Sequence, residues 1–310
     1  MALVDGIWLA QYVEPQLLED FRNYRDDFIG VLERAPERAI DKDGIRFNKL
    51  INNIAFYVNK DTDFNPIVVP FKKNLVEWDK LDTDPTEVTD ADLRAMAFDR
   101  DSAIRAAHTD SWKIGIRDYA MHKLAPAANV DGKTPVVRTT GAEVDLGGGQ
   151  SRLRLTYADL ITYYSIWEQL NLRDQSKFYG ILCAEHRADL LLDRASTQNY
   201  RDIEIDKETG AIKRLFKIKF FENNDNPTYA AAGTLVADGA VPTATDRNAS
   251  TFFYAPNTVY HIEGVKVLHK PMEQDTRSAD PTSETRLHSY GLCDKKQDYG
   301  FGAIVSGSGA

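Results

Sequence analysis

The sequence predicts an α+β fold. Three observations predict it: short β-type runs without a helix over residues 41–81, a long helical segment after them, and a mixed region of helices and strands in the rest of the chain. The length of 310 residues is typical of about two domains. Hydrophobic residues make up 43% and charged residues 27%, which excludes a disordered, collagen-like or coiled-coil protein.

The first 35 residues contain two short amphipathic stretches separated by Pro15. Their apolar residues recur at helical spacing: Ile7, Trp8, Tyr12, Leu17, Leu18 and Phe21. Two small helices cannot bury such residues alone. We therefore expect an N-terminal arm that packs against another surface.

Residues 41–81 alternate between β-type runs and polar turn clusters. The runs are Ile45/Phe47, Ile54/Phe56/Val58, Ile67–Val69 and Val76/Trp78. An isolated two-stranded ribbon is marginally stable in water. Its aromatic residues therefore need a covering surface, from this subunit or from another one; they are Phe47, Phe56, Phe64, Phe71 and Trp78. This need is the first indication of assembly.

The strongest helical segment follows. Thr89 with Asp92 three residues later resembles a capping box, and Pro126 predicts that the helix ends before it. The apolar face is predicted to consist of Leu93, Met96, Ala97, Ile104, Ala107, Ile114 and Met121. A helix of this length exceeds the average for globular proteins, and smaller elements can pack along it.

Three consecutive glycines, Gly147 to Gly149, lie in a loop-rich stretch between residues 126 and 155. A phosphate-binding loop needs Gly-Lys-Ser/Thr or spaced glycines that lead into a helix. Here Gln150, Ser151 and Arg152 follow, and then a β-type run. We interpret the glycines as a flexible connector rather than a nucleotide site.

The remaining elements are predicted in order along the chain. Thr156 with Asp159 forms a second capping box, which begins a helix. After it we expect a strand at 178–183, a helix at 184–192, strands at 203–205 and 216–220, a loop over 228–250, and strands at 252–254, 259–262, 265–268, 287–292 and 299–305.

Charge and cysteine content exclude further classes of protein. The 38 basic and 47 acidic residues give a net charge of −9, which argues against a protein that grips nucleic-acid phosphates. Two cysteines are too few for a disulfide framework and lack metal-ligand spacing, which indicates a reducing compartment. No apolar run is long enough to span a bilayer, and the first residues lack the basic region of a secretory signal.

The search for catalytic chemistry finds one weak candidate. Cys183 and His186 lie three residues apart, so a thiol nucleophile with a nearby base is conceivable. The alternative, which we favour, is a buried cysteine followed by an exposed histidine on a helix surface. The acidic run 79–92 lacks the glycine-centred loop of a calcium site. We therefore expect no catalytic, cofactor-binding or metal-ligating residues.

The order of elements is more informative than any residue cluster. Residues 83–126 resemble the junction from extended loop into spine helix in the major capsid proteins of tailed double-stranded DNA phages, the Hong Kong 97-type fold. Residues 177–193 with 209–227 resemble the axial domain, and residues 285–305 resemble closing strands. Two positions depart from the family: Ala184, where a proline often begins the helix, and Phe216, where glycine is common.

The resemblance implies a division of the chain and a function. We expect an N-terminal arm (1–35), an extended loop (36–85), a peripheral domain with the spine helix (86–155), an axial domain (156–284) and closing strands of the peripheral domain (285–310). Such a subunit forms hexamers and pentamers of an icosahedral phage head that encloses double-stranded DNA. Portal, scaffolding or decoration proteins are the implied partners, without a membrane, and scaffolding would come from a separate protein.

Location and alternatives follow from the same reasoning. The resemblance implies that the protein belongs to the virion and assembles in the cytoplasm of the bacterial host. A neutral or acidic lining suits a container from which DNA must be released. An encapsulin-like nanocompartment shell protein is the first alternative, and a cytosolic α/β enzyme with a Cys183 nucleophile is the second.

Overall fold

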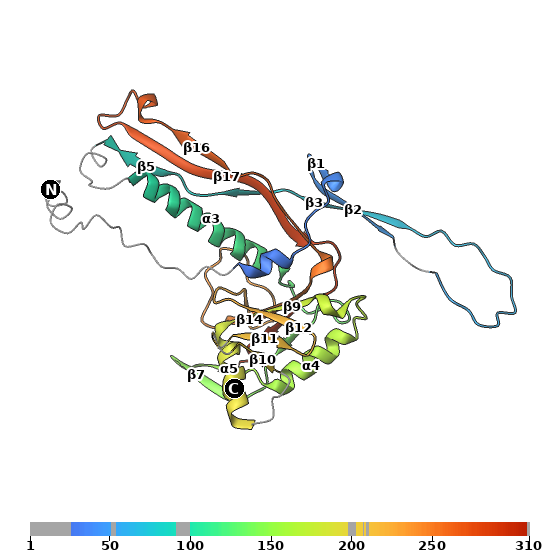
Figure 1. Ribbon diagram of the computed structural model, residues 1–310. Coiled ribbons are helices and arrows are strands. Elements are labelled where there is room, and N and C mark those ends of the chain that lie inside the picture. The colour runs from blue at the N-terminus through green and yellow to red at the C-terminus, as the bar shows by residue number, and fades with distance from the viewer. Residues whose placement is uncertain are drawn as a thin grey trace.

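Two sheets and one long helix organise the molecule. The computed structural model describes residues 26–50, 54–90, 100–197, 203–206, 208 and 211–308. Figure 1 shows an elongated layer, in which helix α3 lies along a sheet, joined to a more compact body. The α+β prediction is confirmed.

The five-stranded sheet is centred on one long strand. Strand β17 (Thr282–Lys295) pairs with β15 (Thr258–Ile262) and β16 (Lys266–Lys270), and also with β4 (Asp79–Asp82) and β5 (Thr86–Thr89). Helix α3 (Arg100–Leu124) runs beside it (Figure 1). The helix ends before Pro126 as predicted. Its predicted start at Thr89 and Asp92 stays a prediction, because Thr89 ends β5, Asp90 is helical, and residues 91–99 lie outside the described residues.

The buried face of α3 agrees only in part with the predicted one: Met121 is buried as predicted. Ala107 is exposed, whereas His108, Trp112 and Leu124 are buried. Leu93, Met96 and Ala97 lie outside the described residues. The apolar periodicity missed this face because a polar side chain, His108, is buried through hydrogen bonds to the hydroxyls of Thr83 and Thr86.

The compact body is built on an eight-stranded sheet. Its strand order is β10 (Ile203–Ile205), β11 (Ile212–Leu215), β12 (Ile218–Glu222), β9 (Phe178–Leu182), β14 (Arg247–Tyr254), β18 (Phe301–Val305) and β6 (Val136–Arg138), and β13 (Thr228–Tyr229) pairs with β14. The predicted loop over 228–250 thus contains β13 and the start of β14. One face of the sheet packs against α4 (Tyr157–Glu168), and the other packs against the end of α3.

The pairing groups three strands differently from the expected ranges, and the division into domains stays a prediction. Strand β18, expected among the closing strands of the peripheral domain, pairs with β14 and β6 in the eight-stranded sheet. All five of its residues are buried, as expected for a strand covered on both faces. Strands β15 and β16, which fall within the predicted axial range 156–284, pair instead with β17 in the five-stranded sheet.

A ribbon projects from the end of the long layer (Figure 1). It consists of β2 (Gly44–Leu50) and β3 (Phe71–Glu77), with β1 (Ile40–Asp41) beside β2. The predicted strands at 54–58 and 67–69 are wrong, because the described part of the connection from β2 to β3 contains no strand. These runs have strand-forming residues, but no described strand pairs with them.

The end of the predicted arm packs on the subunit itself. A 3₁₀ turn, η1 (Asp27–Val31), places Phe28 in a cluster with Met121 and Leu124 of α3, and Leu32 joins it. A second turn, η2 (Glu37–Ala39), precedes β1. The predicted helices around Ile7–Tyr12 and Leu17–Phe21 lie outside the described residues.

Local sequence signals act as expected in the compact body. The Thr156–Asp159 capping box begins α4, with Asp159 N donating to Thr156 Oγ1. Helix α5 (Ala184–Thr197) is longer than predicted. The glycines form the tight turn between β7 (Glu143–Gly147) and β8 (Gln150–Leu153), where all three have positive φ angles. They are therefore not a phosphate loop. Further 3₁₀ turns are η3 (Gln175–Lys177), η4 (Ala255–Asn257) and η5 (Met272–Gln274).

Phe216 occupies a position where the resemblance leads us to expect glycine. It lies in the turn between β11 and β12 with a φ of 52°, a conformation that favours glycine. Its ring stacks on Tyr164 with 5.0 Å between centroids, and Tyr157 lies 5.9 Å away. The ring contacts therefore offset the backbone strain that a glycine would avoid.

Candidate assembly surface

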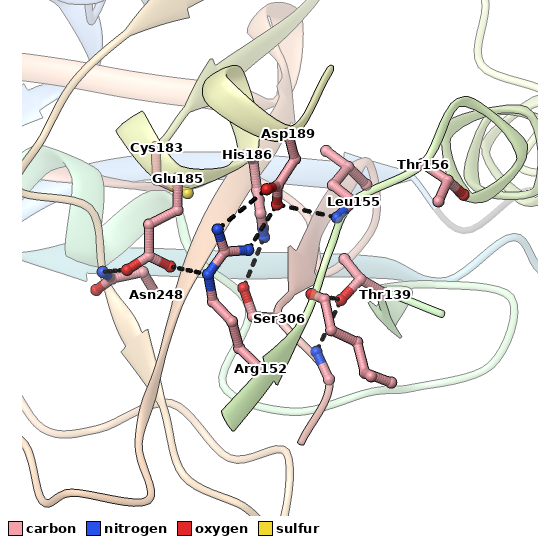
Figure 2. A network of polar contacts seen from close by, with 12 residues as sticks. Thr139, Arg152, Leu155, Thr156, Cys183, Glu185, His186, Asp189, Asn248 and Ser306 are labelled. Atoms are coloured by element: carbon pink, nitrogen blue, oxygen red, sulfur yellow. Dashed lines mark hydrogen bonds and ion pairs between the residues drawn. The ribbon is translucent and has the colours of Figure 1, made fainter. Parts of the chain in front are cut away.

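The predicted thiol candidate lies in a buried polar network (Figure 2). Cys183 and His186 are both buried, so the expected exposed histidine is wrong. The two ring nitrogens of His186 are hydrogen-bonded to the hydroxyls of Ser250 (2.7 Å) and Ser306 (3.0 Å). The Ser250 hydroxyl also donates to Cys183 Sγ at 3.7 Å. The histidine thus joins strand β14 to the segment after β18 and does not act on the thiol.

Electrostatics keep both groups uncharged. Burial raises the pKa of the Cys183 thiol from 9.0 to about 11. Burial also lowers the pKa of His186 from 6.5 to about 4. A reactive cysteine needs a thiolate and solvent access, and a general base needs a pKa near the working pH. This arrangement supplies neither, so the network is a structural one.

An ion pair completes the network. Arg152 of β8 donates two hydrogen bonds to Asp189 of α5, with Nη1–Oδ2 at 2.6 Å and Nη2–Oδ1 at 3.0 Å. Asp189 also accepts from Leu155 N, and Arg152 lies 3.6 Å from Glu185. Sequence analysis missed this pair because its partners come from elements 37 residues apart.

The ribbon presents the most unusual surface of the described residues. Seven large apolar side chains of the connection from β2 to β3 are mostly exposed: Ile54, Phe56, Tyr57, Val58, Phe64, Ile67 and Val68. Phe56 is 90% and Val68 is 88% exposed. Contiguous apolar exposure of this kind marks an interaction site in a soluble protein. We call these seven residues the ribbon tip.

A cation organises part of the ribbon tip. Lys60 Nζ lies 4.5 Å from the ring centroid of Tyr57 and 4.3 Å from that of Phe64. The two rings meet edge to face with centroids 6.1 Å apart. Cation–π contacts contribute about 0.5–1 kcal/mol at exposed sites. Lys60 therefore contacts both aromatic rings of the tip in the single subunit and stabilises their arrangement.

The base of the ribbon is covered by the subunit itself. Ile45 is fully buried and packs with Val259 and Leu292, and Phe47 and Trp78 pack against this cluster. Trp78 Nε1 donates to Asp41 O at 3.1 Å, and its ring lies 5.5 Å from that of His261. Two of the aromatic residues expected to need a covering surface, Phe47 and Trp78, therefore pack against the same subunit. Phe56 and Phe64 stay exposed.

Polar contacts fix the strand that follows the ribbon. Asp79 of β4 accepts a hydrogen bond from the Tyr119 hydroxyl of α3 and forms an ion pair with Lys123 at 2.8 Å. Burial acts to raise the pKa of Asp79, but the contacts with Lys123 and Tyr119 outweigh it and lower that pKa. Burial, and then the contact with Asp79, raise the pKa of Tyr119. The ribbon is thereby anchored to the long helix.

Neither metal nor membrane chemistry is evident in the described part of the chain. The described His, Cys, Asp and Glu residues form no group of three or more that could hold a metal ion. Among the same residues, no helix combines the length and apolarity that crossing a membrane requires.

Comparison with solved structures identifies the fold. No protein-family model and no curated protein sequence matches the chain. The capsid of the cyanophage P-SCSP1u matches with a TM-score of 0.66 at 14% identity, over 95% of this chain and 92% of that one. The capsid of Ralstonia phage GP4 matches with a TM-score of 0.63 at 9% identity, over 97% and 96%. A structure of Mycobacterium phage Che8 gives 0.62 at 13% identity, over 95% and 96%.

These matches span nearly the whole of each chain, so they concern the complete arrangement of ribbon, long helix and two sheets. Identities of 9–14% are too low to transfer individual residues. The chain therefore has the Hong Kong 97-type fold of phage capsid proteins.

Proposed function

We propose that this chain is a structural coat subunit, which assembles into the hexamers and pentamers of an icosahedral phage head around double-stranded DNA. The observation that carries the proposal is the exposed ribbon tip on a fold shared with phage capsids. Full burial of one large apolar side chain contributes about 1.5–3 kcal/mol. Seven such residues gain this only by contact with another molecule.

The structure suggests revised boundaries for the proposed domains. We assign α3 and the five-stranded sheet to the peripheral domain, and the eight-stranded sheet with α4 and α5 to the axial domain. The ribbon is the extended loop, and the arm keeps the range 1–35 expected from the sequence, of which residues 26–35 are described. The closing strand β18 thereby moves to the axial domain.

The proposed partners are further copies of the chain, with portal, scaffolding or decoration proteins and packaged DNA. The net charge of −9 supports a container that holds DNA without gripping its phosphates. The virion is the proposed location, after assembly in the host cytoplasm. An encapsulin-like shell would share the exposed tip, and no observation favours it over a phage head.

An enzyme is the least supported alternative. Its nucleophile would be Cys183, whose raised pKa and burial keep it protonated and inaccessible. The buried network around it has a structural explanation at every contact described above.

Electron microscopy tests the proposal directly. The full chain is expressed alone and with a candidate scaffolding protein, and the products are separated by sedimentation and imaged. We expect closed icosahedral particles in at least one of these preparations. A monomer at every concentration and with every scaffolding candidate would contradict the proposal.

A variant that lacks the ribbon tip tests whether this surface is needed for assembly, with the full chain as its matched control. Residues 54–70 are replaced by a short glycine-serine turn, which leaves β2, β3 and β4 in place. We expect a folded subunit, with unchanged far-ultraviolet circular dichroism, that forms no closed particles. A deletion of residues 44–80 is unsuitable for this purpose, because it removes the buried Ile45 and part of β4.

A further inference from the structure

Helix α4 presents an uncharged surface to solvent. Between Tyr157 and Trp167 the only charged residue is Asp159, which is buried, so the exposed side of the helix carries no charge before Glu168. Charged residues make up 27% of the whole chain. The centres of protein–protein interfaces are depleted of charged residues and enriched in aromatic ones. The composition of α4 is therefore that of an interface rather than of an ordinary solvent-facing helix.

Three side chains of α4 share one side of the helix. Tyr157, Ile161 and Tyr164 recur at helical spacing, and Ile161 is 45% exposed. Phe216 contacts both tyrosines, with its ring centroid 5.9 Å from that of Tyr157 and 5.0 Å from that of Tyr164. The three rings are partly exposed. We call these four residues the aromatic face.

The backbone at Phe216 is strained. Its φ of 52° favours glycine, whereas the other non-glycine residues with positive φ in the described chain, Asn59 and Asn171, are of a type that tolerates this conformation. Strained positions of this kind gather at sites with a function. Glycine would relieve the strain but would remove one ring from the aromatic face. The strain is therefore a second, independent indication that the aromatic face has a partner.

The loop over residues 239–245 is a second uncharged surface. All of its residues are exposed, and no longer run of exposed, uncharged residues occurs in the described part of the chain. Val241 is 90% exposed, and Pro242 follows it. Single exposed apolar side chains are common on protein surfaces, so the distinguishing feature is the uncharged run around Val241.

Hydrogen bonds hold this loop in shape. The Thr243 N–H donates to the Asp246 carboxylate at 2.7 Å, and the Asp246 N–H donates to the Thr243 carbonyl at 3.0 Å. Arg247, which is buried, donates to the Ala244 carbonyl at 2.7 Å. An ordered loop loses less conformational entropy on binding than a flexible one. The tip at Val241 is thereby preorganised for a partner.

The two surfaces lie at opposite ends of the eight-stranded sheet. The loop leads into the start of β14, which runs antiparallel to β9 and pairs its last residue, Tyr254, with Phe178 at the start of β9. Phe216 precedes β12, which runs parallel to β9 from Tyr179 onward. The aromatic face thus adjoins the Phe178 end of β9, and the loop adjoins the Leu182 end. One copy cannot bring its own two surfaces together.

A second copy of the chain is the partner that fits both surfaces. The chain has a net charge of −9, so two copies repel each other where acidic surfaces meet, and uncharged surfaces avoid this repulsion. A contact between unlike surfaces at opposite ends of the body is head-to-tail. Such contacts close into rings when the rotation between copies permits it. The proposed hexamers and pentamers are rings of this kind.

We propose that the tip of the 239–245 loop, Val241 and Pro242, packs on the aromatic face of the next copy, and that this contact joins the compact bodies around each ring. This inference rests on the proposed function, since it names a contact within the proposed hexamers and pentamers. Both sides of the contact are uncharged, so it forms without the free-energy cost of burying a charge.

Insertion of charge tests the contact. Ile161→Glu and Val241→Glu should each lower the fraction of subunits in particles about tenfold, because each buries an unpaired carboxylate in the contact. Ile161→Leu and Val241→Ile are the matched controls, since they keep apolar side chains and should leave the fraction unchanged. Both positions are exposed in the subunit, so the far-ultraviolet circular dichroism and the urea midpoint of the unassembled protein should not change.

A complementary pair of charges tests whether these two residues meet. Val241→Glu with Ile161→Lys should recover the particle fraction to within about threefold of the wild type, because the carboxylate then meets an ammonium group. Leu192→Lys places the same charge on α5, outside both surfaces. Combined with Val241→Glu, it should leave the fraction as low as Val241→Glu does alone.

Cross-linking tests the direction of the contact. Particles of a chain with both Ile161→Cys and Val241→Cys are treated with a short bis-maleimide and should give a ladder of dimers and higher multimers on a denaturing gel. Each single-cysteine chain should stay monomeric, because a head-to-tail contact does not place a residue against the same residue of another copy. Particles assembled from a mixture of the two single-cysteine chains should give dimers only. The native Cys183 and Cys293 are buried and do not interfere.

The outcomes separate this inference from the proposed function. If wild-type particles form and the glutamate variants assemble equally well, or the lysine at position 161 fails to restore assembly, the loop contact is wrong and the coat subunit stands. Dimers from either single-cysteine chain, or no ladder from the double-cysteine chain, also overturn the contact. Absence of wild-type particles in every preparation contradicts the coat function itself.

Discussion

Arg152 and Asp189 form a bidentate ion pair that is almost closed to solvent, with exposed side-chain fractions of 8% and 2%. The pair ties the β7–β8 hairpin to α5, and Asp189 also binds the backbone N–H of Leu155. Loss of one partner leaves the other charge buried. Asp189→Ala should therefore lower the free energy of unfolding of the unassembled subunit by about 3–5 kcal/mol, measured by urea denaturation.

An exposed ion pair serves as the control for this prediction. Lys213 and Asp206 lie 3.0 Å apart, and the Lys213 side chain is 58% exposed. Lys213→Ala should change the free energy of unfolding by about 1 kcal/mol or less. If Asp189→Ala and Lys213→Ala lowered the free energy of unfolding equally, the buried ion pair would stabilise the subunit no more than the exposed one.

His186 should make the stability of the subunit depend on pH. Burial lowers its pKa to about 4, Asp189 and Asp159 oppose this shift, and Arg152 adds to it. Between pH 6.5 and 4 the unfolded chain binds a proton that the folded chain does not. As the pH is lowered from 6.5 to 4, the free energy of unfolding should therefore decrease. At pH 4 it should be about 3 kcal/mol lower than at pH 6.5.

The matched variant isolates the histidine from other titrating groups. His186→Gln keeps hydrogen-bonding capacity but cannot titrate, so its stability should vary less between pH 6.5 and 4 than that of the wild type. Urea midpoints at half-unit intervals measure the difference. Parallel curves for the two proteins would assign the acid sensitivity to other residues.

Cys183 should be inert in the folded subunit. Burial and a pKa raised to about 11 leave almost no accessible thiolate at pH 7. We expect no labelling by iodoacetamide in hours without denaturant, and complete labelling in urea, as followed by mass spectrometry. Cys183→Ala should assemble like the wild type. Rapid labelling of the native protein at this residue would revive the nucleophile hypothesis.

Trp78 and Phe56 should behave oppositely although both belong to the ribbon segment. Trp78 is half-buried and packs on the subunit itself, so Trp78→Ala should lower the subunit's free energy of unfolding by about 2 kcal/mol. Phe56→Ala should leave it unchanged within about 0.5 kcal/mol and reduce the particle fraction instead. Urea denaturation and sedimentation measure the two effects.

From the sequence alone, Trp78 needs a covering surface from this subunit or from another one, and cover from another copy would make Trp78→Ala weaken particles more than the isolated subunit. The packing of Trp78 near Ile45 and His261 changes that expectation, because much of its contact is internal. A subunit that tolerates Trp78→Ala without loss of stability would restore the original interpretation.

Local signals predicted well where their partners are near in sequence. The Thr156–Asp159 capping box and the end of α3 before Pro126 depend on neighbouring residues, and both are confirmed. His186 could not be predicted, because its partners Ser250 and Ser306 lie 64 and 120 residues away. The same reason explains the misplacement of β18, whose neighbours in the sheet come from distant parts of the chain.

The exposed surface was partly predictable. The run 54–58 shows its apolar character in the sequence, but composition alone could not tell which aromatic residues of the ribbon the subunit covers itself. Trp78 and Phe47 are covered because they pack against Ile45 and Val259, and this contact exists only in the folded subunit. Residues 54–58 have high strand propensity, yet they form no strand in the described structure.

Strand β17 joins segments made at very different times during translation. Its residue His288 pairs with Asp82, 206 positions earlier in the chain, so the layer that anchors the ribbon cannot form until the ribosome has synthesised most of the polypeptide. Pairings this far apart in sequence also form slowly. A nascent subunit thus lacks a fixed ribbon, and the timing of synthesis itself delays association with finished copies.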